Sequence, residues 1–293
     1  MRVSGGRPVL ATEPVPAAGD DEVLVRVASA GVCGSDLHLL DAGFLEGRIP
    51  GHEIAGHTPD GTPVAVEPLV SCGVCAACRS GARNRCERHT APLGIELDGG
   101  MADALVVPAA ALVPLPAGVS PHDACLVEPL AVAVHGLERV RPAPGERLLV
   151  IGGGPIGLAV AAVAVAAGLA VDLVGRHAHQ REAAERLGAR AEESGAPDGF
   201  DAYPVVVDAV GSSASLAEAV RRVRPEGRIG IVGIFWEPVR LDISVCMKEV
   251  ELVPSMMYGC TARGRDIDAA AGLLARHPEW ASALVTHRLP LDA

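Results

Sequence analysis

Residues 148–157 read Leu148-Leu149-Val150-Ile151-Gly152-Gly153-Gly154-Pro155-Ile156-Gly157, an apolar run followed by a glycine-rich turn. The glycines fit the pattern Gly-x-Gly-x-x-Gly, and the Ala-rich run after them predicts a helix. The first glycine permits a tight turn, the second lets the backbone approach a pyrophosphate at the helix N-terminus, and the third allows close packing of helix and strand. The stretch therefore predicts a dinucleotide-binding turn. The residues expected at the cofactor are Gly152, Gly154, Pro155, Ile156 and Gly157.

The second half of the chain alternates short apolar runs with helical patterns. Strands are predicted over 148–151, 171–174, 205–208, 228–232 and 249–253, and helices over 155–167, 179–187 and 213–223. This alternation indicates βαβ units and a parallel, doubly wound sheet. Ligands of such sheets bind at the carboxyl ends of the strands. Asp208, at the end of one predicted strand, is therefore assigned to the cofactor site.

The first half consists of short strand-like runs that glycine and proline turns separate. One such run covers 23–27, and Asp60-Gly61 predicts a tight hairpin between 54–58 and 64–66. We therefore expect a mostly antiparallel β domain before the parallel-sheet domain, which makes the fold class α/β. A length of 293 residues fits two such domains.

Composition and charge exclude several classes of protein. Hydrophobic residues make up 49% and charged residues 21% of the chain, which argues against a disordered, collagen-like or coiled-coil protein. The net charge of −11 repels phosphate backbones, so no nucleic acid partner is expected. Residues 148–171 carry no charged side chain, but glycines and a proline divide them, so no membrane span is expected. The N-terminus shows no apolar signal region, and a cytoplasmic location is expected.

Four cysteines lie within fifteen residues, at Cys72, Cys75, Cys78 and Cys86, with two, two and seven residues between them. In a reducing compartment such thiols indicate metal ligands before disulfides. Four thiolates suit a tetrahedral zinc ion and leave no position for substrate, so the expected site is a structural zinc. An iron–sulfur cluster is the alternative, but its fourth cysteine typically follows after three residues and precedes proline.

Other segments offer further ligands, namely Cys33, His52, Glu53 and Glu128. Taken singly, each has a simpler explanation. A lone cysteine is usually a small core residue, and a lone acid or histidine near a turn usually forms a local hydrogen bond. The spacing alone leaves open whether Cys33 and His52 share a metal.

Taken in order, these motifs resemble the zinc-dependent medium-chain dehydrogenases of the alcohol, sorbitol and butanediol dehydrogenase group. The matching segments are 33–38, 51–53, the four-cysteine segment, 127–130, the glycine turn and 286–292. The resemblance implies a GroES-like, mostly antiparallel β catalytic domain over residues 1–125, completed by 257–293. It also implies a Rossmann dinucleotide-binding domain over 126–256, and a dimer or tetramer of identical chains.

The resemblance also implies a catalytic zinc site. Cys33 and His52 would bind this zinc, and either Glu53 or Glu128 would supply the remaining protein ligand. The implied structural zinc ligands are the four clustered cysteines, which gives two zinc ions per chain. The other cysteines, at Cys125, Cys246 and Cys260, match no ligand position and are expected to be core thiols.

The implied activity is the reversible oxidation of a secondary alcohol, diol or polyol to a ketone with a nicotinamide cofactor. Ser35 and His38 match the proton relay of the family, and Asp36 matches an acid beside the zinc. The catalytic residues expected are thus Ser35, Asp36, His38 and Glu53. The alternatives are a zinc-free reductase and a non-catalytic dinucleotide-binding protein of the same fold.

The turn after the second predicted parallel strand bears on the choice of cofactor. NAD-dependent proteins place an acid there for the ribose hydroxyls, whereas this chain has Gly175 followed by Arg176 and His177. Glycine removes the carboxylate that would repel a 2′-phosphate, and arginine offers a charged fork that suits phosphate. We therefore expect NADP(H). The alternative is that Arg176 is an ordinary surface residue and that either cofactor is accepted.

The resemblance implies several dozen further residues after Ala293, with another helix and a closing strand. An unpaired sheet edge is a liability. We therefore expect a version of the chain with this extension to be more stable in a thermal melt.

Overall fold

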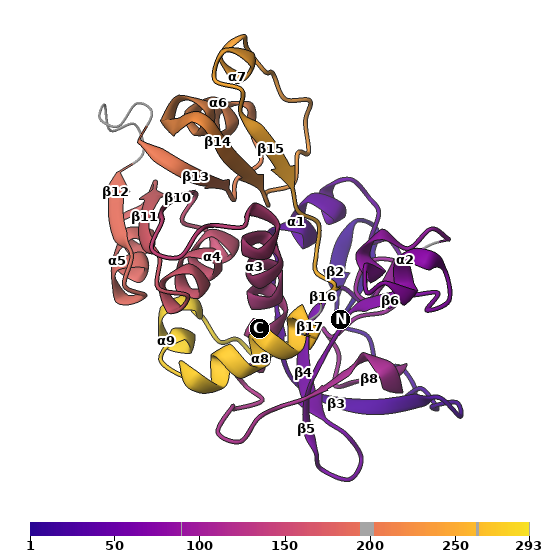
Figure 1. Ribbon diagram of the computed structural model, residues 1–293. Coiled ribbons are helices and arrows are strands. Elements are labelled where there is room, and N and C mark those ends of the chain that lie inside the picture. Colours follow the sequence, from indigo (N-terminus) through magenta and orange to yellow (C-terminus); the bar gives the residue numbers. More distant parts are fainter. Residues whose placement is uncertain (89, 194–201, 262–263, 293) are drawn as a thin grey trace. The chain divides into compact units, whose positions relative to one another are not determined.

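A computed structural model describes residues 1–88, 90–193, 202–261 and 264–292 (Figure 1). The chain divides into two compact units. The first unit comprises Met1–Glu128, Gly259–Ala281 and Val285–Ala293, and the second comprises Pro129–Tyr258 and Ser282–Leu284. One unit contains an antiparallel sheet and the other a parallel sheet, so the predicted α/β fold class is confirmed.

The main sheet of the first unit has five antiparallel strands in the order β8-β3-β4-β5-β9. Their bounds are β8 (Ala104–Pro108), β3 (Glu22–Gly31), β4 (Glu53–His57), β5 (Pro63–Val66) and β9 (Leu112–Pro114). Its core is aliphatic, with Val25, Ile54 and Val107 among its buried members. The predicted hairpin joins β4 and β5, and Gly61 adopts a φ of +86° in its turn, a conformation that glycine adopts without steric cost.

Small elements complete the first unit. Two-stranded antiparallel sheets pair β1 (Arg2–Ser4) with β2 (Arg7–Val9), β6 (Leu69–Ser71) with β7 (Thr90–Pro92), and β16 (Cys260–Thr261) with β17 (Gly264–Arg265). The helices are α1 (Gly34–Asp41), α2 (Ala76–Arg79) and α8 (Asp266–Arg276), with short 3-10 helices at Arg83–Arg85, Ala109–Ala111 and Ala124–Leu126. The buried Glu67 accepts hydrogen bonds from Arg83 at 3.1 Å and Arg265 at 3.2 Å. These contacts join the cysteine segment and the start of α8 to the main sheet.

The second unit contains a six-stranded parallel sheet in the order β12-β11-β10-β13-β14-β15. Its strands are β10 (Arg147–Ile151), β11 (Ala170–Gly175), β12 (Arg190–Glu193), β13 (Tyr203–Asp208), β14 (Val223–Ile231) and β15 (Glu251–Pro254). The order proceeds outward in both directions from β10 and β13, which defines a doubly wound sheet. A ligand crevice of such a sheet lies where the strand order reverses, here between β10 and β13.

The helices of the second unit follow the predicted alternation. They are α4 (Pro155–Ala166), α5 (Ala178–Arg186), α6 (Ser213–Arg222) and α7 (Ser244–Met247), preceded by α3 (Val127–Val140), while the short α9 (Trp280–Leu284) comes late in the chain. The uncharged stretch 148–171 forms β10, α4 and the start of β11 rather than one span. Within the described residues, no helix has the length and apolar character needed to cross a membrane.

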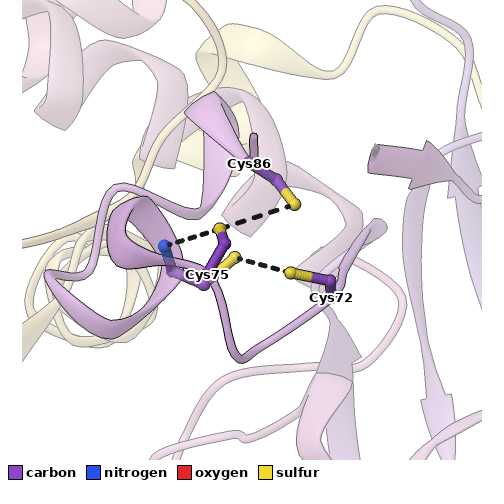
Figure 2. Close-up of side chains that lie close together, drawn as sticks. Cys72, Cys75 and Cys86 are labelled. Atoms are coloured by element: carbon purple, nitrogen blue, oxygen red, sulfur yellow. Dashed lines mark hydrogen bonds between the residues drawn. The ribbon is translucent and has the colours of Figure 1, made fainter. Parts of the chain in front are cut away.

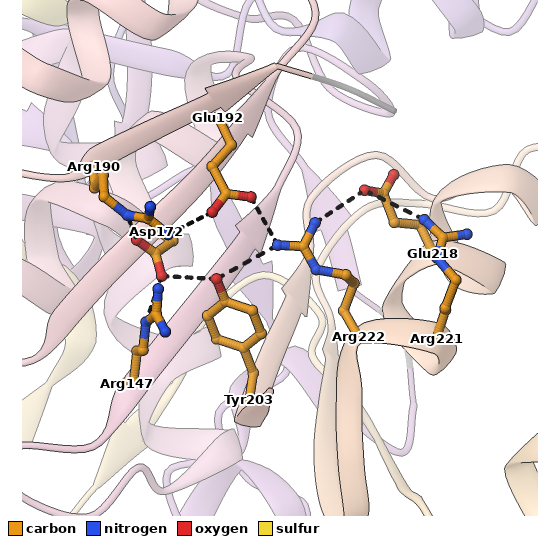
Figure 3. Close-up of polar contacts among 8 residues, drawn as sticks. All are labelled: Arg147, Asp172, Arg190, Glu192, Tyr203, Glu218, Arg221 and Arg222. Carbon is orange, nitrogen blue, oxygen red and sulfur yellow. Dashed lines mark hydrogen bonds and ion pairs between the residues drawn. The ribbon is translucent and has the colours of Figure 1, made fainter. Parts of the chain in front are cut away.

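Polar side chains near the amino ends of these strands form one connected network (Figure 3). The buried Asp172 accepts hydrogen bonds from Arg147 and Arg190, both at 2.6 Å, and from the Tyr203 hydroxyl at 2.8 Å. Arg147 and Arg190 are the first residues of β10 and β12, the two neighbours of β11. Tyr203 is the first residue of β13, which lies beside β10. The network therefore connects four strands near their amino ends, whereas the glycine turn follows the carboxyl end of β10.

Candidate active site

The four clustered cysteines lie close together in the first unit. Figure 2 labels three of them, Cys72, Cys75 and Cys86. The Sγ atoms of Cys72 and Cys78 are 3.9 Å apart, as are those of Cys75 and Cys86. All four Sγ atoms lie within 4.8 Å of one another. Cys75 precedes α2, and its Sγ accepts a hydrogen bond from the backbone N–H of Cys78 at 3.4 Å. The structure thus brings together every residue predicted for the structural zinc.

A second cluster joins Cys33, His52 and Glu53, whose ligand atoms also lie within 4.8 Å of one another. Cys33 immediately precedes α1, His52 immediately precedes β4, and Glu53 is the first residue of β4. Gly31 pairs with Glu53 across β3 and β4, and a Cβ atom at Gly31 would lie 1.8 Å from a Glu53 carboxylate oxygen. Only glycine therefore leaves room for the Glu53 side chain, a requirement that no sequence pattern indicates.

Asp36 connects the two segments of this cluster. One of its carboxylate oxygens accepts a hydrogen bond from the backbone N–H of Cys33 at 3.0 Å, and the other lies 3.2 Å from Nδ1 of His52. Both side chains are buried. Because Nδ1 faces Asp36, the Nε2 atom of His52 is the ring nitrogen left for a metal.

The charges in this cluster alter the pKa values of its members. Burial by itself would lower the pKa of His52. Contacts with Asp36 and Cys33, and the charge of Glu128, raise that pKa to about 11. Burial and the charge of Glu128 raise the pKa of Glu53 to about 8. The buried acids around His52 therefore stabilise a positive charge at this cluster.

Glu128 is the second residue of α3 and is also buried. Its charge acts on His52 and Glu53, but it is not part of the set of three whose ligand atoms are grouped within 4.8 Å. Of the two acids proposed as the remaining ligand, the structure groups Glu53 with Cys33 and His52.

Ser35 and His38 both belong to α1 and are three residues apart, so they lie on neighbouring positions of one helix face. Ser35 is half-buried and His38 is exposed. The order from the Cys33 end of the helix outward is therefore Ser35 first and His38 second, which is the direction a proton relay to solvent requires.

The three glycines of the turn differ in backbone conformation and in the space around them. Gly152 adopts a φ of +108° directly after β10. A Cβ atom at Gly157 would lie 1.8 Å from the carbonyl oxygen of Gly152, so helix and strand could not pack with any other residue there. Around Gly154, which caps α4, an added Cβ would meet no atom within 4 Å among the described residues. Pro155 and Ile156 form the first positions of α4.

The turn after β11 carries several cationic or ionisable side chains. Gly175 ends β11, Arg176 is exposed, and His177 caps α5 with its backbone N–H bonded to Gln180 at 3.1 Å. The guanidinium of Arg181 donates to the carbonyl oxygens of Gly175 at 3.0 Å and Arg176 at 3.1 Å. Arg181 thus holds the backbone of the turn, a contact that no sequence pattern indicated.

Asp208, the remaining residue assigned to the cofactor, ends β13 and is fully buried. Burial raises the pKa of its carboxyl group, while hydrogen bonds from Val210, Gly211 and Ser215 lower it. Both carboxylate oxygens are thus occupied by neighbours in the second unit.

The expectation that the three remaining cysteines are core thiols is wrong for Cys246, which is exposed in α7. Cys125 and Cys260 are partly buried. Cys246 lies in a short helix after a loop, where an apolar-looking sequence does not ensure packing.

These observations define a dehydrogenase of the zinc type. Residues 19–117 match the alcohol dehydrogenase GroES-like domain, and residues 122–293 match the glucose dehydrogenase C-terminus. The chain belongs to the zinc-dependent medium-chain dehydrogenase family and is an NAD(P)-dependent oxidoreductase.

Two relatives and one solved structure show which dehydrogenases this chain is similar to. The chain is 34% identical to L-galactonate-5-dehydrogenase of Escherichia coli strain K12, over 94% of this chain and 86% of the relative. It is 33% identical to D-altritol 5-dehydrogenase of Agrobacterium fabrum strain C58, over 99% of this chain and 91% of the relative. Among solved structures, a zinc-binding dehydrogenase from Sinorhizobium meliloti 1021 bound to NADP superposes with a TM-score of 0.83 at 28% identity, covering 93% of this chain and 86% of that one.

Proposed function

We propose that this protein oxidises a secondary hydroxyl of an open-chain polyol or sugar acid to a ketone, with NADP(H) as cofactor and two zinc ions per chain. The observation that carries the proposal is the cluster of the partly buried Cys33 with the buried His52 and Glu53, to which the buried Asp36 and Glu128 add two further acids. Ser35 and His38 complete the proposed catalytic residues.

The cysteine cluster fits a closed zinc site. Zinc–sulfur bonds of about 2.3 Å in a tetrahedron require sulfur atoms about 3.8 Å apart. The two Sγ pairs are each 3.9 Å apart. We propose that Cys72, Cys75, Cys78 and Cys86 hold this zinc, and that it stabilises the segment rather than taking part in the reaction.

The second cluster fits an open zinc site. Three protein ligands and one free position are typical of catalytic zinc, and Cys33, His52 and Glu53 offer a thiolate, an imidazole and a carboxylate. Within the described part of the chain, Nδ1 of His52 and the facing oxygen of Asp36 have no hydrogen bond of good geometry. A bound cation would fix the imidazole and offset the buried negative charge. Glu128 is the alternative third protein ligand.

The residues of α1 account for the proton that leaves the substrate. Zinc, when bound, supplies a Lewis acid that favours ionisation of an alcohol, and the nicotinamide accepts the hydride. Ser35, the half-buried member of the pair, would accept the proton, and the exposed His38 would pass it to solvent. Asp36 orients His52 and Cys33 and does not exchange the proton itself.

The proposed preference for NADP(H) rests on the turn after β11. Gly175 places no carboxylate where a 2′-phosphate would lie, and the exposed Arg176 offers a bidentate cation. Arg181 supports the proposal because it fixes the two carbonyl groups of this turn. The alternative is an enzyme that accepts either cofactor.

The proposed substrate class follows from the relatives named above, both of which are named as 5-dehydrogenases of polyhydroxylated compounds. We further propose a homo-oligomer, a dimer or a tetramer. Free thiolate ligands need a reducing compartment, and we therefore propose a cytoplasmic location.

The experiment that tests the proposal combines metal analysis with a cofactor-reduction assay. Zinc at about two equivalents, and absorbance of the reduced cofactor with alditols or aldonic acids, would support it. Iron with visible absorbance would instead indicate an iron–sulfur cluster. Zinc confined to the cysteine cluster, with no alcohol oxidised, would favour the zinc-free or non-catalytic alternatives.

A further inference from the structure

Asp208 occupies a central position at the end of β13 in the second unit. Its side chain is 0% exposed. One carboxylate oxygen accepts the backbone N–H groups of Val210 at 2.9 Å and Gly211 at 3.1 Å. The other accepts the hydroxyl of Ser215 in α6 at 3.0 Å. The side chain therefore holds the start of the loop through Val210 and Gly211, and it holds the helix that follows the loop through Ser215.

The backbone of Asp208 also forms hydrogen bonds with the loop that follows β14. Its carbonyl oxygen accepts the N–H groups of Val232 at 3.0 Å and Gly233 at 2.9 Å, which directly follow β14. The two loops are in backbone contact, because a Cβ atom at Gly233 would lie 2.4 Å from the backbone nitrogen of Gly211. A displacement of Asp208 would thus move both loops.

The first of these loops touches the glycine turn. A Cβ atom at Gly152 would lie 2.6 Å from a methyl group of Val210, and one at Gly157 would lie 3.4 Å from Cβ of Ala209. The strands that precede these segments, β10 and β13, are neighbours, and the strand order reverses between them. Loop 209–212 therefore forms a side of the position where a dinucleotide binds in such a sheet.

We propose that Asp208 is a positioning residue for the dinucleotide, which acts by holding loop 209–212 against the glycine turn and not by contacting the cofactor with its carboxylate. The proposal rests on the proposed function, since it assumes that a dinucleotide binds at this turn. It replaces the direct contact that the sequence position suggested, because both carboxylate oxygens already accept hydrogen bonds from protein groups.

The hydrogen-bond pattern predicts different effects for two substitutions. In Asp208→Asn, the amide oxygen can still accept from Val210 and Gly211, and the amide nitrogen can donate to the Ser215 hydroxyl. That hydroxyl already has the Ser212 carbonyl oxygen as an acceptor, at 3.0 Å. In Asp208→Ala the two loop N–H groups, which are partly buried, lose an acceptor whose side chain is fully buried, and this weakens the hold on the loop. Asparagine should therefore preserve dinucleotide binding, and alanine should weaken it.

The test is calorimetric titration of the zinc-loaded protein with NADP⁺ and with NAD⁺. We expect the Kd of Asp208→Asn to stay within about twofold of the wild-type value, and that of Asp208→Ala to rise about tenfold or more. Turnover at saturating cofactor should fall by a smaller factor than the affinity does in Asp208→Ala, because saturation offsets weaker binding of the dinucleotide. Ser215→Ala, which removes one of the three donors to Asp208, should give an intermediate Kd. If Asp208→Ala does not fold, the Kd of Ser215→Ala tests the proposal instead.

Three results have different meanings. A Kd of Asp208→Asn about tenfold or more above the wild-type value would overturn the proposal. It would indicate that the charged carboxylate contacts the dinucleotide directly. Unchanged binding in Asp208→Ala, or in Ser215→Ala where the former does not fold, would overturn it by showing that the loop needs no anchor. Failure of the wild-type protein to bind either dinucleotide would instead refute the proposed function.

Discussion

The Nδ1 atom of His52 lies 3.2 Å from a carboxylate oxygen of Asp36, and both side chains are buried. The other oxygen of the same carboxylate accepts the backbone N–H of Cys33. One acid therefore contacts two of the three residues that we propose as ligands of the catalytic zinc. Such acids fix the tautomer and orientation of a metal-binding histidine and raise its basicity.

Asp36→Asn should weaken binding of the catalytic zinc, because the amide cannot supply the charge that orients and polarises His52. We expect a loss of affinity of about 10–100-fold, measured by competition with a chromogenic chelator. Asp41→Asn, an exposed position at the end of the same helix, is the matched control and should be neutral. Equal zinc affinities for the Asp36 variant and wild type would show that the contact has no role at the metal.

Ser35→Ala and His38→Ala should both slow alcohol oxidation, by roughly 10²–10⁴-fold, with the larger loss for Ser35. In the proposed relay the hydroxyl nearer to Cys33 accepts the proton first, whereas water can partly replace the exposed His38. Ser35→Thr keeps a hydroxyl and should retain most of the activity. Turnover of Ser35→Ala equal to that of wild type across neutral pH would remove this residue from the mechanism.

Gly175→Asp combined with Arg176→Ser should shift the preference from NADP toward NAD. The aspartate would repel a 2′-phosphate and accept hydrogen bonds from the ribose hydroxyls. The guanidinium group of Arg176, which could bind the phosphate, would be removed. The change at 175 is accommodated by a small shift of Arg181, whose Cγ would lie 3.0 Å from the new Cβ. We expect the ratio of kcat/KM values for the two cofactors to change at least about tenfold, the equivalent of 1.4 kcal/mol.

Arg186→Ser, at the far end of α5, is the control for loss of a surface charge near this turn. A wild-type protein that prefers NAD, or a double variant with the same preference as wild type, would contradict the assignment of NADP(H).

Asp172→Asn should destabilise the parallel sheet in a pH-dependent manner. Burial raises the pKa of Asp172, but hydrogen bonds from Arg190, Tyr203 and Arg147 outweigh it and hold the pKa below its usual value. A lowered pKa in the folded state means that the charged form stabilises the protein above the unfolded pKa of about 3.9 and that this contribution is lost as pH falls through the folded value.

The expected loss at about pH 7 is roughly 1–3 kcal/mol, since the side chains of Arg147 and Arg190 are 46% and 62% exposed and solvent weakens their interaction. Denaturant titrations of wild type and variant should differ at neutral pH, and the difference should start to shrink as pH falls below about 4. A difference that stays constant over this range would mean that packing, and not the charge of Asp172, causes the effect.

Much of the parallel sheet could be predicted from the sequence because its signals are local. The strand 148–151, the glycine turn and the helix from Pro155 all follow from neighbouring residues, and the structure has them as β10 and α4. The strand β12 at Arg190–Glu193 was missed, since it is short, polar and lies at the edge of the sheet. Edge strands lack the apolar run that identifies central ones.

The sites were predictable to different degrees for the same reason. The four cysteines are close in sequence, so their spacing alone indicates a shared ion. Cys33 and His52 are nineteen residues apart and meet only through the pairing of β3 with β4, and no spacing rule predicts that meeting. The clearance that Gly31 gives to Glu53 depends on strand pairing between distant residues, and the hydrogen bonds from Arg181 to the turn at Gly175 depend on a side-chain orientation that no sequence pattern indicates.

The central claim is that Cys33 and His52 hold a zinc ion on which alcohol oxidation depends. The most direct test measures zinc content and cofactor reduction in a Cys33→Ala, His52→Ala double variant, with Cys246→Ala as the control for loss of an exposed thiol. We predict about two zinc ions and full activity for the control, and about one zinc ion, no activity and an intact cysteine cluster for the double variant. A double variant that keeps the wild-type zinc content, or that still oxidises the alcohol at the wild-type rate, would contradict this account.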